Sequence, residues 1–323
     1  MRPIIKAARL GAVALALSIG AAQAQDYPNR PITLVVPFPP GAVTDASARL
    51  LQPLLSERLG QQVIVENRPG AGGVVGMGQL ARTEPDGYTI ALTVNAPLVM
   101  APHLQASLPY DPATDFRTVG LFAETYLMLS VRADSPWQTL DDIIAAARER
   151  PGELTFGSAG IGSAHQIAGL VLNELADIDI EHIPFQGGGP AIQDLLGGHI
   201  SMSYGTISAV LPHVQSGALR MIGAVEAGRV PGYPEVPALN ETVPGLETST
   251  WVGIFAPAGT PDDVMERLNA ALMATVQDSA VIQALAGIGM SPLTNTVAEG
   301  EAILVRDIAA WGERIDLAGI APQ

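Results

Sequence analysis

The sequence contains no cysteine among its 323 residues. Disulfide bonds, thiolate metal sites, thiol nucleophiles and Cys-x-x-Cys redox motifs are therefore excluded. Histidine is also scarce, and the five copies, at positions 103, 165, 182, 199 and 213, show no His-x-x-x-His or similar pairing. We expect no metal site and no cofactor, and a fold that rests on its apolar core, for which this length is ample.

Basic residues are few, since 17 lysines and arginines stand against 32 acidic residues. Three of the basic residues, Arg2, Lys6 and Arg9, lie in the first nine positions, so residues 25–323 carry a net charge of −18. A field of this sign argues against nucleic acid and anionic membrane surfaces as partners. If the ligand is an anion, donors close to it must capture it against the field of the whole chain.

Long apolar runs are missing except near the N-terminus. There the basic residues are followed by an apolar run over residues 10–22 and by Ala22-Gln23-Ala24, which has the small-x-small form of a cleavage site. This pattern predicts a secretory signal peptide over residues 1–24, cleaved after Ala24, and an exported chain. The alternative is an uncleaved anchor, but a membrane span needs about 20 apolar residues.

What the sequence does contain is a repeated alternation of strand and helix patterns. Strands are expected at Ile32–Val36, Val63–Glu66, Thr89–Val94, Leu154–Phe156, Ile180–Pro184, Ser201–Tyr204, Arg220–Val225 and Trp251–Ala256. Helices are expected at Ala46–Arg58, Val74–Arg82, Ala164–Leu175, Ala191–Leu196, Thr206–Ser216 and Pro261–Gln277. Such alternation is typical of parallel sheets covered by helices. We predict an α/β fold of two lobes, residues 25–125 plus 254–323 and residues 126–253, joined by a two-strand hinge.

One stretch, Thr33–Leu50, combines an apolar strand, a stiff turn and a helix start. The turn contains Pro37, Pro39, Pro40 and Gly41, and the helix is expected to begin at Thr44 or Asp45, which are both good N-caps. A helix N-terminus offers free backbone N–H donors and a partial positive charge, so it suits an anion. The alternative is an ordinary turn between a strand and a helix that binds nothing.

Four further turns follow expected strands: Asn95–Pro97, Gly157–His165, Gln186–Pro190 and Tyr204–Thr206. They are rich in small residues, hydroxyls and amides. Glycine lets a ligand approach the backbone closely, and successive N–H groups form concavities that hold anions. For each turn taken singly, glycine could instead serve only the backbone geometry.

Motifs of catalysis are not matched. Neither Ser158 nor Ser163 stands in a Gly-x-Ser-x-Gly frame, and the third glycine of Gly70–Gly76 comes one place late for a dinucleotide fingerprint. Ser163 and His165 are too close in sequence to face each other on a helix. We therefore expect no catalytic residues and no enzyme activity.

Several blocks of the sequence resemble a known family. The blocks are Tyr27–Ile32, Val36–Gly41 with Asp45 and Arg49, Leu59–Gln61, Val65–Gly73, Pro85–Thr89, Leu108–Pro112 with Asp115 and Phe116, Ser158–Ser163, His182–Gly187 with Pro190 and Ala191, and Asp194–Leu196. In this order they are similar to the substrate-binding receptors of tripartite tricarboxylate transporters. The resemblance covers essentially the whole chain after the expected signal peptide.

The resemblance implies a type II periplasmic binding protein fold, a periplasmic monomer, and two lobes that close on a small organic carboxylate. It further implies integral membrane transporter subunits as partners, and a carboxylate held by backbone amides, hydroxyls and ordered waters. Carried over by position, the expected site residues are Pro40, Gly41, Ala42, Val43, Thr44, Asp45, Asn95, Ala96, Pro97, Ser158, Ala159, Gly160, Ser163, His165, Gln186, Gly187, Gly188, Tyr204, Gly205 and Thr206. Two other functions stay open: a sensor that reports the acid without transport, and an exported hydrolase.

The sequence departs from the family pattern at two places. Ala42 stands where the family usually has a second glycine, and the segment Asn95–Pro102 lacks the polar pair often found there, carrying Pro97 and Leu98 instead. The second departure makes this wall of the cleft more apolar. We therefore predict that the part of the ligand far from its carboxylate is apolar or aromatic.

Overall fold

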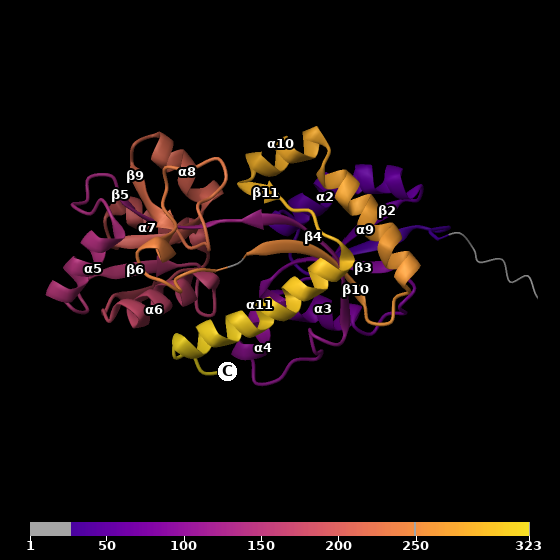
Figure 1. Ribbon diagram of the computed structural model, residues 1–323, viewed down its shortest axis with the longest axis horizontal. Helices are drawn as coiled ribbons and strands as arrows, with labels where there is room; N and C mark the ends of the chain where they lie inside the picture. The colour runs from indigo at the N-terminus through magenta and orange to yellow at the C-terminus, as the bar shows by residue number, and fades with distance from the viewer. Residues whose placement is uncertain (1–26, 249, 323) are drawn as a thin grey trace, which may run out of the picture.

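The computed structural model describes residues 27–248 and 250–322, and it contains two sheets, each covered by helices (Figure 1). We call the larger sheet with its helices lobe 1 and the smaller sheet with its helices lobe 2. The elements of lobe 1 are β1 Ile32–Val36, α2 Val43–Leu59, β2 Val63–Asn67, η2 Ala71–Gly73, α3 Val74–Leu80, β3 Thr89–Val94, η3 Ala96–Met100, α4 Ala101–Leu104, β4 Phe116–Thr125, β10 Trp251–Pro257, α9 Asp262–Val276, α10 Ser279–Gly287, β11 Met290–Pro292 and α11 Val297–Leu317. Those of lobe 2 are β5 Leu127–Arg132, α5 Leu140–Glu149, β6 Thr155–Ser158, α6 Ala164–Ala176, β7 Glu181–Pro184, α7 Gly188–Gly197, β8 Met202–Thr206, α8 Ile207–Gln215, β9 Leu219–Ala224 and η4 Leu239–Glu241. The predicted signal peptide lies outside the described residues.

The sheet of lobe 1 has the strand order β11-β4-β10-β3-β1-β2. Strand β1 is parallel to β2 and to β3, so the carboxyl ends of these three strands lie at one edge. The apolar run of β1 is buried almost throughout, as expected for a strand covered on both faces. Helix α2 packs on this part of the sheet and begins at the same edge.

The sheet of lobe 2 has the order β7-β6-β8-β5-β9. Strand β6 is parallel to both β7 and β8, and the helices α6, α7 and α8 follow these three strands directly. Each helix therefore starts where a strand ends. This arrangement brings three helix N-termini together on one side of lobe 2.

The chain crosses between the lobes twice, once between β4 and β5 and once before β10. Thr125 N–H donates to Thr250 O at 3.0 Å, so the two crossovers lie side by side as a hinge. The lobe boundaries at 125/126 and 253/254 stay a prediction; the sheet of lobe 1 includes all of β10 from Trp251 onward.

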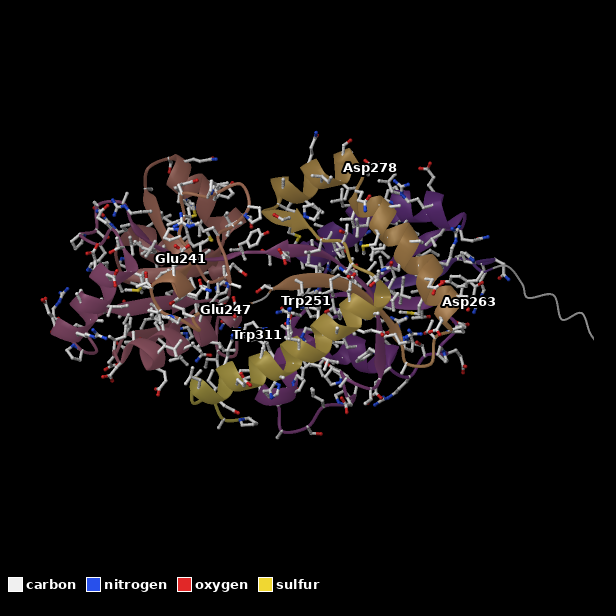
Figure 2. All side chains as sticks on the ribbon, in the orientation of Figure 1. Glu241, Glu247, Trp251, Asp263, Asp278 and Trp311 are labelled. Atoms are coloured by element: carbon white, nitrogen blue, oxygen red, sulfur yellow. The ribbon has the colours of Figure 1, made fainter. Side chains whose placement is uncertain are left out.

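Helix α11 runs across the hinge. It packs on β4, η3 and α4 of lobe 1 and reaches α6 of lobe 2, as its course in Figure 1 shows. The indole N–H of Trp251 donates to Asp307 Oδ2 at 2.7 Å, and Trp311 is fully buried in the same core cluster. The C-terminal helix therefore anchors the return crossover near the middle of the molecule, where Trp251 and Trp311 are labelled in Figure 2.

Most of the expected strands and helices are present, but several starts differ. Helix α2 begins at Val43 with Ala42 as its N-cap, so neither Thr44 nor Asp45 caps it. The segment expected to be a turn at Asn95–Pro97 is instead the start of the π-helical turn η3, with Asn95 as its N-cap, and α4 follows. Within the described residues, no helix is long and apolar enough to cross a membrane.

Candidate functional site

The turn after β1 is held by the Asp45 carboxylate. Asp45 accepts hydrogen bonds from Gly41 N at 2.9 Å, from Arg49 Nε at 3.1 and 3.0 Å, and from Asn67 Nδ2 at 2.9 Å. The hydrogen bonds from Arg49 and Gly41, with that from Asn67, lower the pKa of the buried Asp45 carboxyl to about 2. The carboxylate is therefore ionised and occupied by donors of its own lobe. Its structural role is to fix the turn.

The same turn contains five other expected site residues. Gly41 has φ +83°, which requires glycine, whereas Ala42 has φ −66° and ψ 159°, which any residue adopts. Pro40 and Val43 are exposed. The hydroxyl of Thr44 is buried and, within the described part of the chain, has no hydrogen-bond partner. A buried hydroxyl without a partner is unfavourable, so this atom marks a place where a polar group of a ligand or a water would be stabilising.

Asn95, Ala96 and Pro97 follow β3, which is parallel to β1. Asn95 is buried, and its N–H donates to Trp251 O at 3.1 Å, which ties this turn to the hinge strand. Pro97 packs against η2, because a Cβ added at Gly73 would lie 3.2 Å from Pro97 Cγ. The side chain of Leu98 is fully buried in the core, so it does not form the apolar wall expected from the sequence.

In lobe 2, a chain of hydrogen bonds holds the turn between β6 and α6. Gly162 N donates to Gln166 Oε1 at 2.7 Å, and Gln166 Nε2 lies 3.4 Å from His182 Nδ1. His182 Nε2 lies 2.6 Å from Ser158 Oγ, which in turn donates to Gly160 O at 3.2 Å. His182 is not among the site residues expected from the sequence, because 24 residues separate it from Ser158 and only the β6–β7 pairing brings them together.

The direction of these bonds decides whether Ser158 and His182 could act as a nucleophile and its base. Because Gln166 Oε1 accepts from Gly162, its Nε2 donates toward His182 Nδ1, and the imidazole proton is then on Nε2. A protonated Nε2 donates to Ser158 and cannot take its proton. Ser158 is also fully buried, and burial lowers the pKa of His182. The geometry favours a structural chain of hydrogen bonds over a hydrolase site.

Ser163 and His165 stand at the start of α6. Ser163 is the N-cap, and its Oγ accepts from Gln166 N. Burial lowers the pKa of His165 to about 4, so its ring is neutral at physiological pH. Its Nδ1 is buried without a partner among the described residues, and a Cβ added at Gly188 would lie 3.4 Å from His165 Cε1. His165 therefore lies against the first residue of α7.

The remaining expected residues lie at the other strand ends of lobe 2. Gly160 packs near Phe185 O, which brings the turn of Ala159 and Gly160 beside that of Gln186 and Gly187. Gly205 and Thr206 end β8, and Thr206 is the N-cap of α8. Tyr204 differs from the expectation: its ring is fully buried edge-on to Phe156, so its side chain does not line the cleft in this structure.

The arrangement suits an anion. Helices α2, α6, α7 and α8 all begin at the carboxyl ends of parallel strands, and the first amides of a helix have no partner within it. In open α/β sheets, ligands bind at this edge. Two lobes can thus present several N–H donors and the positive ends of helix dipoles without an arginine. Among the residues that the structure describes, no three metal-ligating side chains cluster.

A cavity of about 310 Å³ lies where the two lobes meet. Lobe 1 contributes Ala96 and Pro97, together with Val74, Met100, Ala101 and Leu104. Lobe 2 contributes Ile161 and Gly162, and the C-terminal segment contributes Ile320 and Ala321. Of these residues, only Ala96 and Pro97 were expected in the site. The sequence signal that could have located this cavity is an apolar residue, Ile161, within a turn of small and polar residues.

Comparison with known proteins decides the family. The family model of the tripartite tricarboxylate transporter family receptors matches residues 47–319. The chain belongs to this receptor family. This result confirms the resemblance seen in the sequence. The receptor is 38% identical over 286 residues to the UPF0065 protein in the tcbD-tcbE intergenic region of Pseudomonas sp. strain P51, covering 87% of this chain and 85% of that protein.

Solved structures confirm the fold. The receptor is similar to R. palustris Rpa4515 with adipate, with a TM-score of 0.78 and 32% identity over 92% of this chain and 100% of that chain. It is also similar to MatC from Rhodopseudomonas palustris with bound malate, with a TM-score of 0.73 and 30% identity over 90% and 100%. The predicted α/β fold of the two-lobe type II periplasmic binding proteins is therefore correct. The family consists of periplasmic solute-binding receptors.

Proposed function

We propose that this protein is a periplasmic receptor that captures a small organic carboxylate between its lobes and delivers it to a tripartite tricarboxylate-type membrane transporter. The observation that carries the proposal is the set of helix N-termini at the carboxyl ends of parallel strands in both lobes. The Thr44 hydroxyl on α2 and His165 Nδ1 on α6 are buried without a partner among the described residues, and both stand in the first turns of these helices. Both could be satisfied by a bound ligand or its waters.

The chemistry of the relatives supports a carboxylate as the ligand. Two similar solved structures hold adipate and malate, both of which are small carboxylates. In the present chain the acid would be held by the turns at Pro40–Asp45 and Ser158–Ser163, with Gln186–Gly188 and Thr206 completing the site. Asp45 would hold its own turn in place and, since its charge is paired with Arg49, would not repel the ligand.

The delivery step requires membrane subunits as partners, and we propose a monomeric periplasmic protein released from its signal peptide after Ala24. Deleting the gene and measuring uptake of radiolabelled carboxylates by whole cells tests this step. Uptake of the bound acid should fall to background and return with the wild-type gene. Unchanged uptake, together with tight binding by the purified protein, would contradict delivery and point to a sensor.

A further inference from the structure

The cavity of about 310 Å³ lies where lobe 1 and lobe 2 contact each other. Leu104 of lobe 1 and Gly162 of lobe 2 meet there, since a Cβ added at Gly162 would lie 3.4 Å from Leu104 Cδ1. At this contact the cavity wall passes from residues of lobe 1 to residues of lobe 2. Its C-terminal side is made by Ile320 and Ala321, which follow α11.

The lining of this cavity carries no charged side chain within the described residues. Apart from glycines and alanines, it is made of Val74, Pro97, Met100, Leu104, Ile161 and Ile320, and Gln105 is its one amide side chain. Ile161 is 68% exposed, an unusual exposure for isoleucine, and it lies in a turn otherwise made of alanine, glycine and serine. An apolar group placed in the cavity would cover this side chain and remove apolar surface from water.

The lining of the cavity is adjacent in sequence to the proposed carboxylate site. Gly162 directly precedes Ser163, the N-cap of α6, and Pro97 lies on the turn after β3. A carboxylate at the start of α6 would therefore leave the rest of its carbon chain beside Ile161 and Leu104. The volume of about 310 Å³ exceeds that of an apolar cavity of roughly 150 Å³ that accepts benzene.

We infer that this receptor selects a monocarboxylate with an apolar tail, and that the cavity between Leu104, Ile161 and Ile320 receives that tail. The inference rests on the proposed carboxylate-binding function. A second carboxylate in the same position would lose its hydration against an apolar wall that offers no cation. The specificity of this chain would then differ from that of the relatives that hold malate or adipate.

Hexanoate and adipate form a matched pair of probes, because they share a six-carbon chain and differ in whether its far end is a methyl group or a carboxylate. Isothermal titration of the purified protein should give a Kd for hexanoate at least tenfold lower than for adipate. Along the series propionate, butyrate, pentanoate and hexanoate, each added methylene should tighten binding about fourfold. Equal or tighter binding of adipate would overturn the inference and leave the proposed function standing. A failure of every acid to bind would overturn the proposed function and the inference with it.

Two variants locate the tail in the cavity. Ile161→Asn in lobe 2 and Leu104→Asn in lobe 1 add a neutral polar group at partly or largely exposed positions. Each should weaken hexanoate binding at least fivefold and change propionate binding less than twofold. The matched control is Val305→Asn, a similarly exposed apolar residue on α11, which should change neither. If Ile161→Asn and Leu104→Asn each weakened hexanoate and propionate binding equally, the tail would have to lie outside this cavity.

Discussion

His182 Nε2 lies 2.6 Å from Ser158 Oγ, which joins β7 to the last residue of β6, where the turn toward α6 begins. Removing the ring in His182→Ala should leave Ser158 and Gln166 without their shared partner and loosen residues 158–163. These residues are proposed to hold the carboxylate, so binding would have to order them again. Since one hydrogen bond contributes about 1 kcal/mol, the affinity for the ligand should fall about fivefold to tenfold. Titration calorimetry measures this loss. His199→Ala, at an exposed histidine of the same lobe, is the control and should leave affinity unchanged.

The Thr44 hydroxyl provides a test that separates binding from stability. Thr44→Val keeps the shape of the side chain and removes an oxygen that has no partner in the described protein, so the melting temperature should stay or rise. Ligand affinity should fall about fivefold to tenfold, the equivalent of one hydrogen bond. Thr118→Val removes another buried hydroxyl, on β4, that has no partner among the residues described, and it should raise stability without changing affinity. Unchanged affinity in Thr44→Val would show that this hydroxyl does not reach the ligand.

Asp45 is expected to give acid-sensitive stability. Its pKa is lower in the folded protein, at about 2, than its ordinary value of 3.8, so its contribution is present above pH 4 and lost as pH falls toward 2. This lowering corresponds to about 2 kcal/mol. Asp45→Asn should therefore lower the free energy of unfolding by about this amount at pH 7, and by less at pH 3. Asp263→Asn, at an exposed acid in the first turn of α9, should change it by less than about 0.5 kcal/mol (Figure 2).

The stability contributed by Glu226 should depend on pH in the direction opposite to that contributed by Asp45. It lies at the hinge, where it accepts from Leu127 N at 3.3 Å, and burial, with Glu124 and Glu247 nearby, raises its pKa well above 4.5 despite the opposing charge of Arg314. The folded protein then binds a proton more tightly than the unfolded chain does. The stability from this group is thus present below pH 4.5 and is lost as pH rises toward the folded pKa.

Glu226→Gln keeps an oxygen for Leu127 and removes the charge, so it should raise the melting temperature at pH 7 and leave it nearly unchanged at pH 4. Thermal unfolding followed by circular dichroism at both pH values measures the difference. Glu235→Gln removes a charge from an exposed position of the same lobe and is the control. Equal changes in melting temperature for the two variants would contradict the prediction that burial at the hinge makes the charge of Glu226 unfavourable.

The sequence was sufficient for the elements whose patterns are local. Strand β3, Thr89–Val94, has the expected bounds, because an apolar run between turn residues specifies a buried strand. The start of α2 was misplaced by treating Thr44 and Asp45 as caps, whereas Asp45 is used within the first turn to accept from Gly41. Local propensity does not reveal that an alanine, Ala42, takes the cap position while the polar residues lie inside the first turn.

The parts of the site that were missed depend on contacts between distant segments. His182 reaches Ser158 through strand pairing, and Ile320 lines the same cavity as Ile161 because α11 crosses the hinge. The spacing of these residues along the sequence does not predict that either pair lies close together. The expectation of an apolar wall after β3 came from Pro97 and Leu98, but only Pro97 lines the cavity, since Leu98 faces the core. The helical turn η3 and the following α4 also bring Met100 and Leu104 to the cavity lining.

The central claim is that the protein binds a carboxylate, and thermal unfolding of purified residues 25–323 against a library of organic acids tests it most directly. Each acid is paired with its neutral amide. An acid at 100 times its Kd should add about 2.7 kcal/mol to the free energy of unfolding and raise the melting temperature, while its amide should not. An unchanged melting temperature with every acid, or equal shifts for acids and their amides, would contradict the claim.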